Sequence, residues 1–156
     1  MLQKEPGTVL RRIGVMEEVV VLGRLPEAAV RHLGLATPER TVWLHPNTAH
    51  HIYLQRGFEV GEADFVFRHL PRVVCQPHYC GCDPRSPRRL DLVNVADDGA
   101  RAVFAGLKVV EAATALSGRD EIWVSTAHRL PGNFLARKRY RHSLRPLDTL
   151  DEGVGR

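Results

Sequence analysis

The sequence predicts an α+β domain with N-terminal helices packed on a four-stranded, mainly antiparallel sheet. Two helical segments with an apolar face occur within residues 41–70. β-type segments separated by turn residues then follow, at 72–75, 90–95, 101–112 and 121–128. Helices followed by strands, rather than alternating with them, are typical of this class. The 156 residues are enough for one domain with its own core.

The composition limits the classes of protein to which this chain can belong. The chain is 44% hydrophobic and 26% charged, and its net charge of +4 suits a polyanionic partner without requiring one. It lacks the run of about 18 apolar residues that a membrane helix needs. The start, MLQKEPGTVLRRIG, lacks the apolar centre of a signal peptide. Three cysteines within eight residues do not form a secreted disulfide framework. We therefore expect a cytoplasmic protein without membrane insertion.

The N-terminal part contains two short elements. Residues 17–23 (EEVVVLG) form a β-branched run and predict a strand. Pro26 suits the first turn of a helix over 26–33, which Gly34 would close.

The stretch 42–58 (VWLHPNTAHHIYLQRGF) is the centre of the functional hypothesis. It predicts a strand at 41–44, a turn at His45-Pro46, an N-cap at Asn47 or Thr48 and a helix ending near residue 57. His50 and His51 are the one adjacent histidine pair in the chain, near the helix start. Such imidazoles can move protons at neutral pH, or they can be ordinary surface histidines.

A second helix is predicted over 62–70. Ala63, Val66, Phe67 and Leu70 recur at helical spacing, and we expect Pro71 to end the helix before a strand at 72–75. Arg68 lies off this apolar stripe, either as a solvated side chain or as a phosphate contact.

The segment CQPHYCGCDP carries four soft-metal ligands, Cys75, His78, Cys80 and Cys82. Zinc prefers thiolates and imidazoles in a tetrahedron. No second ligand pair occurs elsewhere, so a loop of packed or solvent-facing thiols is the alternative to a small zinc site.

The remaining chain predicts strands and basic segments. Residues 83–89 form a proline-broken basic loop that contains Arg88 and Arg89, and a strand follows at 90–95. Residues 101–112 alternate as a strand, although 109–116 also fit a helical face. In the strand at 121–128, Thr126 and His128 should share the face of Ile122 and Val124, opposite Trp123 and Ser125.

The tail at 134–145 is strongly basic, with Arg137, Lys138, Arg139 and Arg141 around Tyr140. Such a segment can lie along a nucleic-acid backbone or form a solvated terminal helix.

Three motifs together resemble the phage-associated members of the nuclease superfamily that unites barnase, EndoU, colicin nucleases and RelE-type toxins. They are HHIYLQRG, ADFVFRHLPRVV, and FAGLKVV followed by EIWVSTAHRL. The likeness covers about residues 41–130 as a nuclease-like core, with 131–156 as a basic extension. Family members often repeat a histidine soon after the first, where this chain has Arg56-Gly57.

The resemblance implies a metal-independent ribonuclease, a toxin or phage-derived enzyme that acts on RNA and can have a neutralising protein partner. By position it implies His51 (or His50) from the helix, Lys108 from a central strand, and Ser125, Thr126 or His128 from the last strand. These groups suit cleavage by 2′-hydroxyl attack, which needs a base, an acid and a cation near the phosphate. No cofactor is expected beyond the zinc already considered. The alternative is a non-catalytic module that binds nucleic acid or protein.

Overall fold

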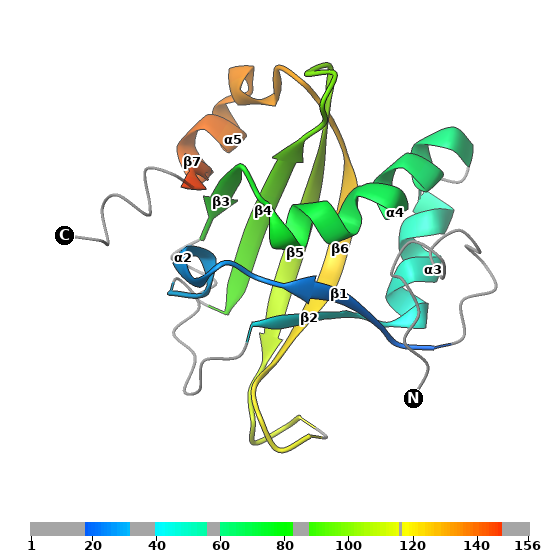
Figure 1. Ribbon diagram of the computed structural model, residues 1–156, viewed down its shortest axis with the longest axis vertical. Helices are drawn as coiled ribbons and strands as arrows, with labels where there is room; N and C mark the ends of the chain where they lie inside the picture. The colour runs from blue at the N-terminus through cyan, green and yellow to red at the C-terminus, as the bar shows by residue number, and fades with distance from the viewer. Residues whose placement is uncertain (1–17, 32–39, 56–59, 83–87, 116, 148–156) are drawn as a thin grey trace.

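The structure is a computed structural model that describes residues 18–31, 40–55, 60–82, 88–115 and 117–147. It has an α+β fold around one mixed sheet with strand order β1-β2-β6-β5-β4-β3-β7 (Figure 1). The strands are β1 (Val20–Arg24), β2 (Thr41–Leu44), β3 (Tyr79–Gly81), β4 (Arg89–Val95), β5 (Arg101–Val110), β6 (Glu121–Pro131) and β7 (Arg145–Pro146). The class is as predicted, but the four-stranded, mainly antiparallel sheet is wrong.

The sheet is larger than predicted because short strands join both of its edges. β1 pairs antiparallel with β2, and β2 lies parallel to β6, which makes the sheet mixed. Alternate residues of β1 and β2, such as Leu22 and Leu44, are buried in the same core as the long strands, and this burial favours their addition. At the other edge, β3 pairs with β4 and β7 pairs with β3. β3 and β7 are too short to show a hydrophobic period.

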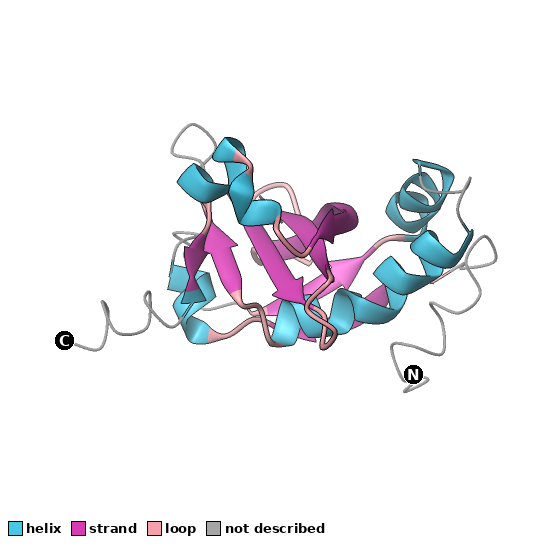
Figure 2. Ribbon diagram, turned by 90° about the horizontal axis from the view of Figure 1, so that it is seen from above, coloured by secondary structure: helices cyan, strands magenta, loops and turns pink. Residues whose placement is uncertain are grey.

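Helices cover the two sides of the sheet unequally. They are α2 (Glu27–Val30), α3 (Pro46–Gln55), α4 (Val60–Cys75) and α5 (Lys138–Ser143), with a 3-10 turn, η2 (Phe134–Ala136). Figure 2 shows α4 along one side of the sheet, whereas α5 and η2 lie on the other side. In the described part of the chain, no helix is both long enough and apolar enough to cross a membrane.

Helix α4 continues through Pro71, so the predicted helix end and the predicted strand at 72–75 are both wrong. The apolar stripe of the helix extends to Val73 and Val74, which are fully buried together with Leu70. Burial of this extra turn outweighs the backbone hydrogen bond that a proline inside a helix removes. The chain therefore reaches β3 one turn later than its proline suggests.

Replacing this internal proline should stabilise the protein. In Pro71→Ala, a backbone N–H can donate to the carbonyl of Phe67, which proline forbids. Proline also restricts the unfolded chain, and this stabilising effect is lost in the alanine variant. The net expected gain in the free energy of unfolding is about 1–2 kcal/mol. Urea denaturation measures it. Pro26→Ala is the matched control, because Pro26 precedes helix α2, where no N–H is needed. Equal effects of both substitutions would contradict the argument.

The sheet separates two apolar clusters. The larger cluster lies under α4 and includes Val103, Ala105 and Leu107 of β5. The smaller cluster lies on the other side, where Phe104 of β5 packs with Phe134 and other residues near α5. Because residues alternate along β5, Gly106 and Lys108 belong to the side of Phe104. We refer to this side, beyond the cover of α5, as the open face.

Candidate functional site

Polar side chains gather on the open face around Gly106. A methyl group built on Gly106 would lie 3.0 Å from Thr126 Cγ2, 3.2 Å from a terminal guanidinium nitrogen of Arg89 and 3.5 Å from Ser125 Oγ. Glycine therefore lets the Thr126 methyl group, the Arg89 guanidinium and the Ser125 hydroxyl approach the central strand closely. Lys108 lies two residues further along the same face of β5 and is exposed.

A β-bulge places Ser125 and Thr126 together on this face. The pairing of β5 with β6 shifts between Gly106 and Leu107, so the bulge adds one residue to β6 at Ser125. The Ser125 hydroxyl donates a 3.0 Å hydrogen bond to the carbonyl of Gly106. Beyond the bulge, Ala127 faces the cluster under α4.

The sequence-based face assignment in β6 is therefore wrong. Thr126 and His128 lie opposite Ile122 and Val124, because the extra residue reverses the alternation. They share the open face with Trp123.

A pocket of about 200 Å³ joins this face to the start of helix α3. It is lined by His45, Thr48, Lys108, Val110, Trp123 and Val124. The Lys108 ammonium makes no ion pair with any residue in the described ranges. The pocket therefore combines an unneutralised cation, an imidazole, a hydroxyl and an aromatic ring.

His45, rather than Asn47 or Thr48, caps helix α3. Its Nδ1 accepts a 3.0 Å hydrogen bond from the backbone N–H of Asn47, and its carbonyl accepts one from Ala49. The predicted N-cap is wrong because Pro46 suits the first helical position and thus makes its predecessor the cap. With Nδ1 as acceptor, the neutral ring carries its proton on Nε2.

The two predicted histidines of α3 are exposed and lie on different sides of the helix. At 100° per residue, His51 lies 60° from Thr48, which lines the pocket, whereas His50 lies on the far side of that helix. Within the described ranges, neither ring makes a hydrogen bond. His51 is thus the histidine of the pair that sits one turn beyond the pocket.

His128 lies at the other end of the open face. It pairs with Phe104, and the two rings stack with centroids 4.8 Å apart. Its Nδ1 lies 3.2 Å from the carbonyl oxygen of Arg129. The ring donates a hydrogen bond to this oxygen only when Nδ1 carries a proton. Four residues of strand, about 14 Å, separate the positions of Phe104 and Lys108 along β5. His128 and Lys108 therefore share a face but not a pocket.

The predicted nucleic-acid contacts fall into two groups. Arg68 pairs with Asp64 at 3.2 Å and Arg88 with Glu111 at 3.1 Å, so neighbouring carboxylates offset both charges. Arg89 has a longer ion pair, 3.7 Å, with Asp91. The remaining predicted cations lie exposed in and just before α5: Arg137, Lys138, Arg139 and Arg141. The buried ring of Tyr140 holds this short basic helix on the sheet.

The four predicted zinc ligands have different surroundings. Cys75 is exposed at the end of α4, whereas Cys80 is buried in the core. Burial, and to a smaller extent Cys82 and Asp91, raises the pKa of Cys80 to about 12, which opposes thiolate formation. His78 accepts a 2.8 Å hydrogen bond from Val95 N–H through Nδ1. Within the described ranges, no three His, Cys, Asp or Glu residues are grouped to hold a metal. Zinc binding stays a prediction.

Sequence reasoning missed His45 and Trp123 as site residues. Their rings lie 6.1 Å apart at the pocket, and the Trp123 indole donates a 3.0 Å hydrogen bond to Glu121. A usable signal existed: His45 follows the predicted strand two residues after Trp43, and Glu121 and Trp123 have the same spacing, which places each pair on one side of its strand. The contact between these strands depends on the parallel pairing of β2 with β6, which has no local signature.

Comparison of the chain with protein-family models, curated proteins and solved structures found no match.

Proposed function

We propose that this protein binds RNA across its open face and cleaves it by attack of a ribose 2′-hydroxyl on the adjacent phosphate. The observation that carries the proposal is the pocket in which Lys108, His45 and Thr48 converge. A phosphate in this pocket would meet an ammonium group, an imidazole N–H and a hydroxyl. These are the donors that a phosphate oxyanion accepts.

Each group has a distinct role in this proposal. His51, one turn along α3 from Thr48, is the base that removes the 2′-hydroxyl proton. The Lys108 ammonium stabilises the negative charge that grows on the phosphorane oxygens. His45 donates from Nε2, because the bond from Asn47 occupies Nδ1. A neutral imidazole can stabilise developing charge as such a donor. As the bond from the 2′-oxygen to phosphorus forms, the bond from phosphorus to the 5′-oxygen breaks, and the leaving 5′-oxygen takes a proton from solvent water. Side chains thus supply the base, the hydrogen-bond donor and the cation of this metal-independent reaction.

Flanking cations would hold the strand on either side of the reacting phosphate. Arg89, beside Gly106, lies next along the face, and the Ser125 hydroxyl and the Thr126 side chain lie near it. Beyond them, α5 presents the exposed side chains of Lys138 and Arg141. Phosphate contacts of this kind position a strand without reading its sequence.

The proposal is tested by incubating RNA with protein in excess chelator. We expect shortened products that end in a 2′,3′-cyclic phosphate, identified by mass spectrometry, because the 2′-hydroxyl is the attacking group. DNA of the same sequence is the control and should stay intact, since it lacks that hydroxyl. RNA that remains intact after prolonged incubation would contradict the proposal.

A non-catalytic nucleic-acid-binding module is the second candidate. The observation that favours it is the row of exposed cations on α5, together with the separation of His128 from Lys108. This candidate predicts that RNA binds with an affinity that falls steeply with salt, and that no product forms. The same incubation therefore separates the two candidates.

A further inference from the structure

A second hollow lies beside the pocket, on the other side of Trp123. Its volume is about 500 Å³, and its lining comprises Val19, Thr41, Trp43, Ser117, Arg119, Asp120, Glu121 and Trp123. Trp123 is common to both linings. A ligand group in the second hollow would therefore lie next to a group held at Lys108.

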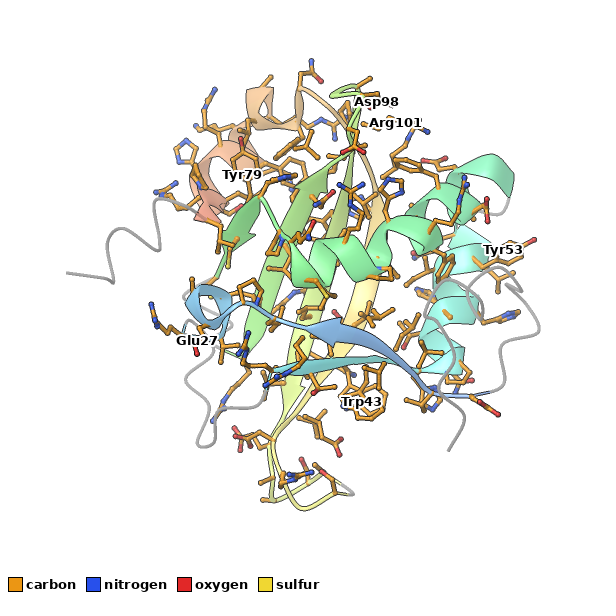
Figure 3. The ribbon with its side chains drawn as sticks, in the orientation of Figure 1. Glu27, Trp43, Tyr53, Tyr79, Asp98 and Arg101 are labelled. Atoms are coloured by element: carbon orange, nitrogen blue, oxygen red, sulfur yellow. The ribbon has the colours of Figure 1, made fainter. Side chains whose placement is uncertain are left out.

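Two indole rings form one wall of this hollow. Trp43 pairs in register with Trp123 across the parallel strands, and their ring centroids lie 6.2 Å apart at an angle of 34°. Both rings are partly exposed. Figure 3 shows Trp43 beside β2, at the end of the sheet from which the β5–β6 loop extends. Val19 adds apolar surface from the strand edge and is 42% exposed.

A hydrogen bond from the indole N–H fixes the orientation of the Trp123 ring. Its indole N–H donates to Glu121, whose other oxygen accepts a 3.3 Å hydrogen bond from the backbone N–H of Ser117. Hydrogen bonds from Ser117 and Trp123 lower the pKa of Glu121, so this carboxylate is ionised at neutral pH. A fixed ring loses little conformational freedom when a flat ligand stacks on it.

The two neighbouring sites differ in the charge of their lining residues. The pocket at Lys108 and His45 is cationic, whereas the described lining of the hollow contains the carboxylates of Asp120 and Glu121 together with the guanidinium of Arg119. A phosphate is therefore attracted to the first site. A flat, neutral, aromatic group with N–H donors suits the second, because indole faces stack on such rings and carboxylates accept from them.

We propose that this hollow is a nucleobase subsite, in which a base of the strand stacks on Trp43 and Trp123 while its neighbouring phosphate lies at Lys108. The inference rests on the proposed binding of RNA to the open face and deepens it, since it assigns the base and phosphate to separate sites. Stacking accepts any base, so the subsite gives affinity with little sequence preference.

The test compares two ligands that differ only in their bases. One is a DNA hexamer, which cannot be cut because it lacks the 2′-hydroxyl, and the other is an abasic hexamer with the same phosphates. The chain has two tryptophans, Trp43 and Trp123, so tryptophan fluorescence reports on this hollow and, through Trp123, on the Lys108 pocket. The abasic hexamer carries the same phosphates, so the difference between the two hexamers isolates the effect of the bases. We expect the normal hexamer to quench fluorescence and to bind about 10-fold more tightly than the abasic one.

Equal affinities for the two hexamers, with no base-dependent quenching, would overturn the subsite. This outcome is distinguishable from failure of the proposed function: uncut RNA with base-dependent quenching removes only the catalytic proposal, whereas cleaved RNA without a base effect removes only the subsite. Trp43→Leu should abolish most of the base-dependent gain, and Trp43→Phe should keep it because the aromatic face remains. The comparison of the two hexamers uses only the unaltered protein. It therefore tests the subsite even if the Trp43→Leu variant does not fold.

Discussion

RNA cleavage by the Lys108→Ala variant is expected to be slower by about 10²–10³-fold, which is the usual loss when one preorganised group near a transition-state oxyanion is removed. Lys108 is exposed and has no ion-pair partner in the described ranges, so its removal should leave folding unchanged. The loss should appear in the single-turnover rate constant, because the ammonium acts on charge that develops during the reaction. Thermal unfolding of the variant checks that its fold is intact.

Arg129→Gln is the matched control for this prediction. It removes one positive charge from the neighbouring strand β6, but Arg129 pairs with Glu62 of α4 at 3.3 Å, on the side of the sheet opposite Lys108. The Arg129 side chain is 44% exposed and that of Glu62 is 17% exposed, so this ion pair is partly buried and its removal should cost about 1–3 kcal/mol of stability. Cleavage by this control is therefore measured below its unfolding temperature. We expect normal cleavage by this control. Equal losses in both variants would mean that net charge matters and that the pocket does not.

The second large effect concerns stability. Phe67→Ala should lower the free energy of unfolding by about 3–5 kcal/mol, because it removes an aromatic side chain from a packed core and leaves a cavity. Phe67 is 1% exposed and belongs to the cluster between α4 and the sheet. The denaturant midpoint should fall while the slope of the transition stays constant.

Arg68→Ala is the control for this substitution, in the next position of the same helix. Its side chain is 57% exposed, and its ion pair with Asp64 lies on the solvent side. The expected loss is at most about 1 kcal/mol. If the two substitutions in α4 cost the same, the helix does not bury its Phe67 face against the sheet.

Local pattern was sufficient for the elements that build the candidate site. The alternation of Val103, Leu107 and Val109 predicted strand β5, which carries Lys108 on its other face. The helical spacing of Ala63 and Phe67 likewise predicted most of α4. These patterns can be recognised in the sequence because the apolar residues of a buried face recur at the period of the helix or strand that carries them.

Two predictions from the sequence pattern were wrong. In one, an extra residue shifted the pairing register of a strand, and in the other, burial of side chains outweighed the tendency of proline to end a helix. The bulge at Ser125 reversed the face of Thr126 and His128, and no local signal marks it, because it depends on the partner strand. Pro71 predicts a helix end, but the buried Val73 and Val74 keep the next turn helical. In both cases packing against distant residues outweighed a local rule.

The amino-acid order alone thus set the class of fold, the main strands and helices, and the residue types able to handle a phosphate. Which of those side chains meet was settled by pairing between distant strands. β2 joins β6 in parallel, and this brings His45 and Trp43 beside Trp123 and Lys108, while His128 is left about 14 Å along the face. Such pairing is chosen by the burial that the whole sheet achieves, and no segment carries that information within itself.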